Sequence, residues 1–198
     1  GNQQAPEVHI FHEAPENPRL YVKAPLDKLA YAGSGPESQA HFRLNYRIYK
    51  NYEYRTLFDS GGRSISNTKN EAKKQNYNKT VTFNIPNADQ YYLLEVEVYD
   101  KVADQKARTF TFYRPYQKGY EQRFLVRLHP EGKIYTRSFI PKGQPFTIAT
   151  SSAVDTLTIK RYSQKAFGTA APPFKEDHAN KELATANPDT IYTISPDK

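Results

Sequence analysis

Apolar and polar residues alternate along much of this chain, most clearly over residues 41–48. Phe42, Leu44, Tyr46 and Ile48 fall on one face of an extended segment there, and the residues between them are polar. A period of two predicts a half-buried antiparallel strand whose apolar face is turned toward a core. The alternation recurs in three further stretches: 92–98, 124–128 and 157–160.

Residues that favour turns separate these stretches. Residues 59–62, Asp-Ser-Gly-Gly, and residues 130–133, Pro-Glu-Gly-Lys, each predict a hairpin turn between strands. Phe124, Val126 and Leu128 form the predicted inner face of the strand that precedes the second turn.

Helical periodicity is scarce. Residues 25–32 are expected to form one or two turns, and residues 70–76 a short polar helix or an ordered loop. Many of the 14 prolines lie near predicted strand ends, which suits an all-β chain because proline cannot donate to a strand ladder. We therefore predict an all-β fold of two consecutive immunoglobulin-like antiparallel β-sandwich domains.

The two predicted domains divide at residues 113–119, where proline and glycine interrupt two alternating runs. The first sandwich is expected over 7–114 in about seven strands, after a disordered lead-in at 1–6. The second is expected over 115–198, with a long loop at 166–188 before a last strand.

The composition narrows the available chemistry. The 198 residues include no Cys, Met or Trp, which excludes disulfides, cysteine-ligated zinc and thiol nucleophiles. Phe and Tyr make up 14% of the chain, too many for a disordered polar tract, and the net charge of +7 is spread along the sequence. No apolar run approaches the roughly 18 residues of a membrane span, so we expect no transmembrane segment.

The order of elements along the chain is similar to that of a known family. The stretches that carry the similarity are 42–54, 57–62, 92–100, 113–120, 124–126, 140–143 and 171–174. Together they resemble the N-terminal region of the GWxTD-domain proteins, cell-envelope proteins of the Bacteroidota. The Gly-Trp-x-Thr-Asp motif that names the family is absent, since the chain contains no Trp. The resemblance implies an exported protein, periplasmic or associated with the outer membrane, with its signal peptide removed and its chain ending before that motif.

Histidines and carboxylates give little support for catalysis or metal binding. His9 and His12 are close in sequence, but strand geometry points them to opposite faces, and we expect two half-exposed histidines rather than a metal site. Asp100 and Asp104 flank a turn without the alternating ligands of a calcium loop, so we expect a hairpin with solvated acids. We predict no enzyme, no cofactor and no metal.

One strand and the residues after it interleave cationic and aromatic side chains. Arg43, Arg47 and Tyr49 share the outward face of the strand, and Tyr52 and Tyr54 follow directly. Such a surface binds nucleic acid by phosphate contact and stacking, or polysaccharide by stacking on sugar faces. The alternative is a solvated sheet face with cross-strand pairs of Tyr and Arg, which the nearby acidic residues favour. We predict no nucleic-acid partner.

A second aromatic group lies at the predicted domain junction. Tyr113, Tyr116 and Tyr120 indicate either an aromatic hinge packed between domains or an exposed patch that binds a partner. Phe174, in a proline-rich part of the long loop, is a further candidate contact.

The function predicted from these features is that of a non-enzymatic cell-envelope module. It would serve as a β-sandwich spacer and protein-interaction region of a larger secreted or lipid-anchored GWxTD-like protein, with a protein partner in the envelope. The alternative is a carbohydrate-binding accessory module that uses exposed tyrosines to bind a polysaccharide.

Overall fold

The computed structural model describes residues 4–50, 56–136, 140–161 and 188–194. The chain divides into two compact units, residues 1–153 and 154–198. The fold is all-β, as predicted, and every strand pair in the described ranges is antiparallel. None of the helices in these ranges has the length and apolar character needed to cross a membrane.

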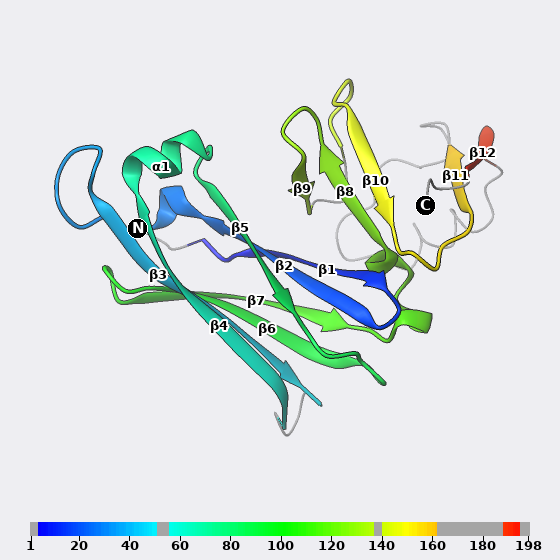
Figure 1. Ribbon diagram of the computed structural model, residues 1–198, viewed down its shortest axis with the longest axis horizontal. Helices are drawn as coiled ribbons and strands as arrows, with labels where there is room; N and C mark the ends of the chain where they lie inside the picture. Colours follow the sequence, from blue (N-terminus) through cyan, green and yellow to red (C-terminus); the bar gives the residue numbers. More distant parts are fainter. Residues whose placement is uncertain (1–3, 51–55, 137–139, 162–187, 195–198) are drawn as a thin grey trace, which may run out of the picture. The chain divides into compact units, whose positions relative to one another are not determined.

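The first seven strands form a sandwich of two facing sheets (Figure 1). One sheet has the order β1 (Glu7–Ala14), β2 (Asn17–Pro25), β5 (Asn78–Asn84), and the other has the order β4 (Leu57–Thr68), β3 (Gln39–Tyr49), β6 (Tyr92–Asp100), β7 (Gln105–Tyr113). This division of consecutive strands between two sheets is that of an immunoglobulin-like sandwich.

The core lies between the two sheets and uses the apolar faces that the alternation predicts. Phe42, Leu44 and Ile48 of β3 are buried in one cluster with Leu20 and Val22 of β2. Burial of one such side chain contributes roughly 1.5–3 kcal/mol. The cluster is therefore the main source of stability for the sandwich.

Residues 59–62 lie inside β4, and the hairpin turn predicted there is wrong. Gly61 pairs with Tyr46 of β3, and a Cβ on Gly61 would lie 2.5 Å from Cε1 of that ring. The Tyr46 hydroxyl donates to Oδ2 of Asp59 at 2.8 Å. The glycine is needed because the tyrosine side chain lies across the neighbouring strand, not because the backbone turns.

The two short segments with helical signals form short helices. Residues 26–28 form η1 (Leu26–Lys28), and α1 (Lys69–Lys74) follows β4. A capping box begins α1: the Thr68 hydroxyl accepts from the backbone N–H of Glu71 at 3.1 Å, and the Glu71 carboxylate accepts from the backbone N–H of Thr68 at 2.9 Å.

The carboxylate of Asp100, at the end of β6, is buried and binds two loops. It accepts from the backbone N–H of Val102 at 2.9 Å and of Ala103 at 3.1 Å in the hairpin, and from that of Ala30 at 2.7 Å after η1. The expectation of a solvated acid is wrong for Asp100, because backbone amides take the place of water.

A second sheet system follows the sandwich within the same unit. The elements are η2 (Tyr116–Lys118), η3 (Tyr120–Arg123) and a sheet of order β10 (Phe146–Thr150), β8 (Phe124–Leu128), β9 (Lys133–Tyr135). The predicted turn at 130–133 joins β8 and β9, with Gly132 at φ +63°.

The inner face predicted for β8 is wrong. Leu125 is its buried residue, whereas Phe124, Val126 and Leu128 are half-buried. Residues 124–126 are all apolar, so alternation alone does not distinguish the two faces of this strand.

The second unit is described through one hairpin, β11 (Leu157–Arg161) paired with β12 (Thr190–Ile194). Strands were predicted in both places. The predicted domain boundary between residues 114 and 115 stays a prediction. Most of the predicted lead-in and loop, residues 1–3 and 166–187, lies outside the described residues.

Candidate functional site

The outer face of the β4-β3-β6-β7 sheet includes Arg43, Arg47 and Tyr49, the outward residues predicted for β3. Directly paired residues of neighbouring antiparallel strands share a face, so the register defines rungs across the four strands. In strand order β4, β3, β6, β7 the rungs are Leu57–Tyr49–Leu93–Phe112, Ser60–Arg47–Glu95–Phe110, Gly62–Asn45–Glu97–Arg108 and Ser64–Arg43–Tyr99–Lys106. We call this surface the outer face.

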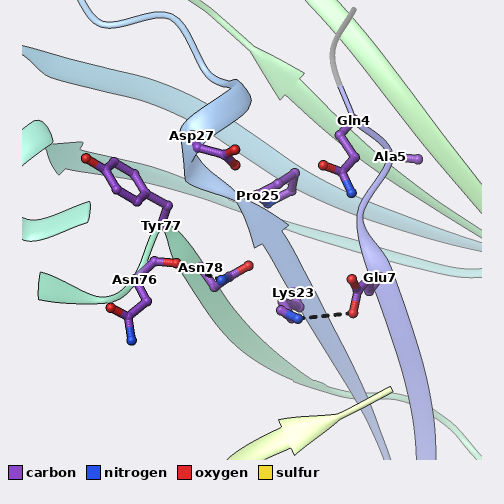
Figure 2. A pocket seen from close by; sticks show the side chains of 9 residues that line it. All are labelled: Gln4, Ala5, Glu7, Lys23, Pro25, Asp27, Asn76, Tyr77 and Asn78. Atoms are coloured by element: carbon purple, nitrogen blue, oxygen red, sulfur yellow. Dashed lines mark hydrogen bonds and ion pairs between the residues drawn. The ribbon is translucent and has the colours of Figure 1, made fainter. Parts of the chain in front are cut away.

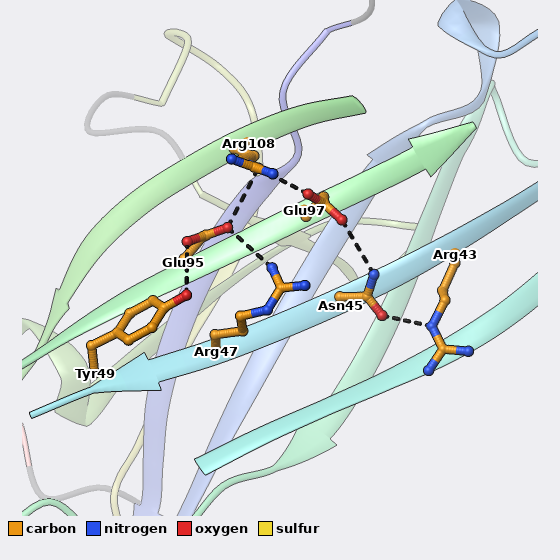
Figure 3. A network of polar contacts seen from close by, with 7 residues as sticks. All are labelled: Arg43, Asn45, Arg47, Tyr49, Glu95, Glu97 and Arg108. Atoms are coloured by element: carbon orange, nitrogen blue, oxygen red, sulfur yellow. Dashed lines mark hydrogen bonds and ion pairs between the residues drawn. The ribbon is translucent and has the colours of Figure 1, made fainter. Parts of the chain in front are cut away.

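Glu95 lies buried near the middle of the outer face, with only 3% of its side chain exposed (Figure 3). It accepts a hydrogen bond from Nη1 of Arg47 at 3.1 Å and from the hydroxyl of Tyr49 at 3.2 Å. Nε of Arg108 lies 3.4 Å from the same carboxylate. Arginines on both neighbouring strands therefore enclose this glutamate.

Glu97 is buried in the next rung, with 2% of its side chain exposed. It accepts from Nε of Arg108 at 2.8 Å and from Nδ2 of Asn45 at 3.4 Å, and Oδ1 of Asn45 accepts from Nε of Arg43 at 2.7 Å. Burial alone would raise the pKa of Glu97, but the hydrogen bond from Arg108 and the nearby positive charges outweigh it and lower the pKa. Glu97 is thus ionised at neutral pH and holds the arginine in place.

The network is suited to positioning side chains on the surface. Glu95 and Glu97 are almost inaccessible to solvent, so a molecule bound on the outer face would contact the arginines above them rather than the carboxylates. Their polar atoms are also occupied by hydrogen bonds from neighbouring strands. The arrangement favours recognition of a bound partner over proton transfer to it.

The outer face ends in exposed apolar side chains. Phe110 is 49% exposed, Phe112 58% and Leu57 51%. Phe110 and Phe112 are successive outward residues of β7, and exposed apolar side chains that lie together in this way mark interaction sites. Phe110 and Phe112 are not among the site residues predicted from the sequence, although their alternation with Thr109 and Thr111 carries the same period-two signal as the other strands.

The structure separates the three junction tyrosines. Tyr113 is fully buried in the core, where its hydroxyl donates to the carbonyl oxygen of Pro86 at 2.7 Å and desolvation raises its pKa. Tyr116 and Tyr120 lie together around Arg123, whose guanidinium is 4.2 Å and 4.6 Å from their ring centres. Of the three, Tyr120 is the exposed one, at 67%.

The two N-terminal histidines contact separate backbone carbonyls. Nε2 of His9 lies 2.8 Å from the Phe124 oxygen, and Nε2 of His12 lies 3.2 Å from the Arg114 oxygen. Desolvation by burial lowers the pKa of both rings. The expectation of half exposure is wrong for His12, which is buried with its ring centre 5.9 Å from that of Tyr113.

Three predicted site residues, Tyr52, Tyr54 and Phe174, lie outside the described residues. Within the described ranges, no group of three or more histidine and carboxylate side chains is arranged to hold a metal ion.

A polar hollow of about 320 Å³ lies beside β1 and β2 (Figure 2). Its charged lining residues are Glu7, Lys23 and Asp27. Lys23 forms an ion pair with Glu7 at 3.1 Å, and Glu7 also accepts a hydrogen bond from Thr136. The charges at this hollow are largely paired within the chain, which leaves it less suited to binding an ion than the outer face.

Comparisons with known proteins do not assign a family. No family model matches the chain, and no curated protein matches it. A solved structure that does match is a D341A D367A calcium-binding mutant of Bacteroides uniformis β-glucuronidase 2, with 11% identity and a TM-score of 0.35. The match covers 63% of this chain and 14% of that chain. At this level the similarity carries no argument about function.

Proposed function

We propose that this chain is a non-enzymatic cell-envelope module, the β-sandwich spacer and protein-interaction region of a larger secreted or lipid-anchored GWxTD-like protein. The outer face is its binding surface for a protein partner. The observation that carries the proposal is the exposure of Phe110 and Phe112 beside a buried ion-pair network. Exposed aromatic side chains with a polar surround are typical of protein interfaces. The proposed location, in the periplasm or at the outer membrane, rests on the resemblance of the sequence to the GWxTD-domain proteins.

A carbohydrate-binding accessory module is the second candidate. Tyr91 and Tyr120 support it, because both rings are about half-exposed or more and both have cationic side chains over them. Among the described residues of the outer face, Tyr49 is buried, Tyr99 is half-buried with its hydroxyl bonded to Asp104, and the exposed rings are phenylalanines. Phenylalanine lacks the polar group that tyrosine offers to a sugar hydroxyl, so the outer face favours a protein partner.

Site-specific photo-crosslinking in the source cells tests the proposal. A photoreactive amino acid is placed at Phe110 or at Phe112, and a third version carries it at Phe146 of β10, which is similarly exposed at 45%. We expect both outer-face positions to label one shared protein that the Phe146 position does not label, identified by mass spectrometry. Equal labelling from all three positions, or no adduct from the outer face, would contradict the proposed function.

A further inference from the structure

We propose that the outer face recognises an acidic segment of its partner protein, one that carries carboxylates along most of its length and an apolar side chain at one end. Arg43, Arg47 and Arg108 would bind the carboxylates, and Phe110 and Phe112 the apolar end. This inference rests on the proposed function and names the chemistry of the partner.

Each of the three arginines is anchored through one nitrogen. Arg43 and Arg108 use Nε, and Arg47 uses Nη1; these are the guanidinium hydrogen bonds and ion pairs that the structure gives them within the described residues. The side chains of Arg47 and Arg108 are 37% and 46% exposed, and Arg43 is also exposed. Terminal nitrogens are therefore available for the two-point hydrogen bonding that guanidinium groups make with carboxylates.

The charge of the surface favours an anion. The two glutamates are buried beneath the arginines, so the positive groups are the ones that solvent reaches. Lys106 adds an exposed cation in the last rung. Asp104, an exposed acid nearby, accepts a hydrogen bond from the hydroxyl of Tyr99. A mostly positive surface attracts an acidic partner and sets its orientation.

The positions of the charged and apolar groups favour a protein over another polyanion. The apolar groups occupy the first two rungs, at Leu57, Phe110 and Phe112, and the arginines occupy the second to the fourth. Successive rungs are about 7 Å apart along a strand, so the four rungs span about 20 Å, or roughly six to seven extended residues. A nucleic acid or an acidic polysaccharide is charged along its whole length and offers no apolar end.

Peptide binding to the full chain tests this inference. The probe is a fluorescein-labelled synthetic peptide of about ten residues, with Leu and Phe at one end and Glu over the rest, made in both chain directions. Its control has Gln in place of every Glu. We expect the better Glu peptide to bind at least about tenfold more tightly than its Gln control by fluorescence anisotropy, and more weakly as salt is added.

Variants at exposed positions locate the site. We expect Arg43→Gln and Phe112→Ser each to weaken binding of the Glu peptide by about five- to tenfold. The matched controls Arg161→Gln and Phe146→Ser remove an exposed cation and an exposed phenylalanine elsewhere and should leave binding unchanged. Circular dichroism verifies that every variant is folded.

Three results would overturn the inference. The first is equal affinity for the Glu and Gln peptides, and the second is an equal effect of outer-face and control variants. The third is tighter binding of heparin or of a single-stranded DNA oligonucleotide than of the peptide, with no effect of Phe112→Ser, which would identify a polyanion as the ligand. If Phe110 and Phe112 crosslink to one partner in cells but the Glu peptides do not bind, the proposed function is supported and only the inference of an acidic segment is wrong.

Discussion

The two faces of β6 are buried to the same degree by opposite means. On the inner face, Leu94, Val96 and Val98 are fully buried against the other sheet. On the outer face, Glu95 and Glu97 are almost as inaccessible, but arginine, tyrosine and asparagine side chains of the neighbouring strands cover them. Burial alone therefore does not say what a position contributes.

The inner and outer faces also differ in how they affect stability. Apolar burial stabilises the fold in proportion to the area removed from water. A buried ion pair contributes little net stability, because desolvation offsets the attraction, yet removal of one partner is costly since the other charge stays buried. The inner face of β6 thus holds the sandwich together, while the outer face fixes the positions of surface side chains.

The largest expected effect is on the inner face. Leu94→Ala removes a fully buried side chain and leaves a cavity, so we expect the free energy of unfolding to fall by about 3 kcal/mol. Urea denaturation followed by circular dichroism measures the change. A loss below about 1 kcal/mol would show that the core collapses around the cavity and would weaken the contrast between the faces.

On the outer face, Arg108→Met removes the cation that contacts both glutamates. We expect a loss of about 2 kcal/mol, less than for Leu94→Ala because the arginine is itself half-exposed. The double variant Glu97→Leu/Arg108→Met should recover part of that loss, since it removes a buried charge together with its partner. A lower free energy of unfolding for the double variant than for Arg108→Met would contradict this expectation, because it would mean that the ion pair itself stabilises the fold.

Acid should destabilise the outer face through Glu97. The pKa of Glu97 is lower in the folded chain than its ordinary value of 4.5, so its contribution is fully present above that value and is lost as the pH falls through the folded value. We expect Glu97→Gln to lose less stability than the unmodified chain between pH 7 and pH 3.5, measured by urea midpoints. If the two proteins lose the same stability over this pH range, Glu97 does not contribute to acid destabilisation.

A smaller pH effect is expected from His12, on the inner side of β1. Its pKa is below the ordinary 6.5 in the folded chain because burial disfavours the charged ring. The unfolded chain therefore takes up the proton first, and stability falls as the pH drops below 6.5 toward the folded value. His12→Gln should show a shallower decline between pH 7.5 and 5.5 in thermal unfolding, whereas the exposed control His129→Gln should keep the original slope.

Sequence periodicity predicted the all-β fold and most strands, because every second residue of a half-buried strand faces the core and is apolar. It misplaced a turn at 59–62, because glycine serves two purposes and only the register shows that Gly61 makes room for the Tyr46 ring. On the outer face, alternation placed Arg43, Arg47 and Tyr49 together correctly.

The chain's pattern did not predict which outward residues would be accessible. Glu95 and Glu97 are covered by side chains of β7, the next strand along the chain, and of β3, whose contacting residues lie 46–52 positions away. Tyr113 enters the core although it belongs to the same aromatic group as the exposed Tyr120. Such differences depend on long-range pairing, which a local period of two does not encode.

The carboxylate of Asp100 has a further consequence for how the sandwich fluctuates. It holds the backbone amides of Ala30, Val102 and Ala103, which belong to two loops far apart in the chain. Each loop gives up a hydrogen bond to this carboxylate when it opens, so these amide protons should be protected from exchange with deuterium in both loops. Asp100 thereby restrains two connections at one end of the sandwich.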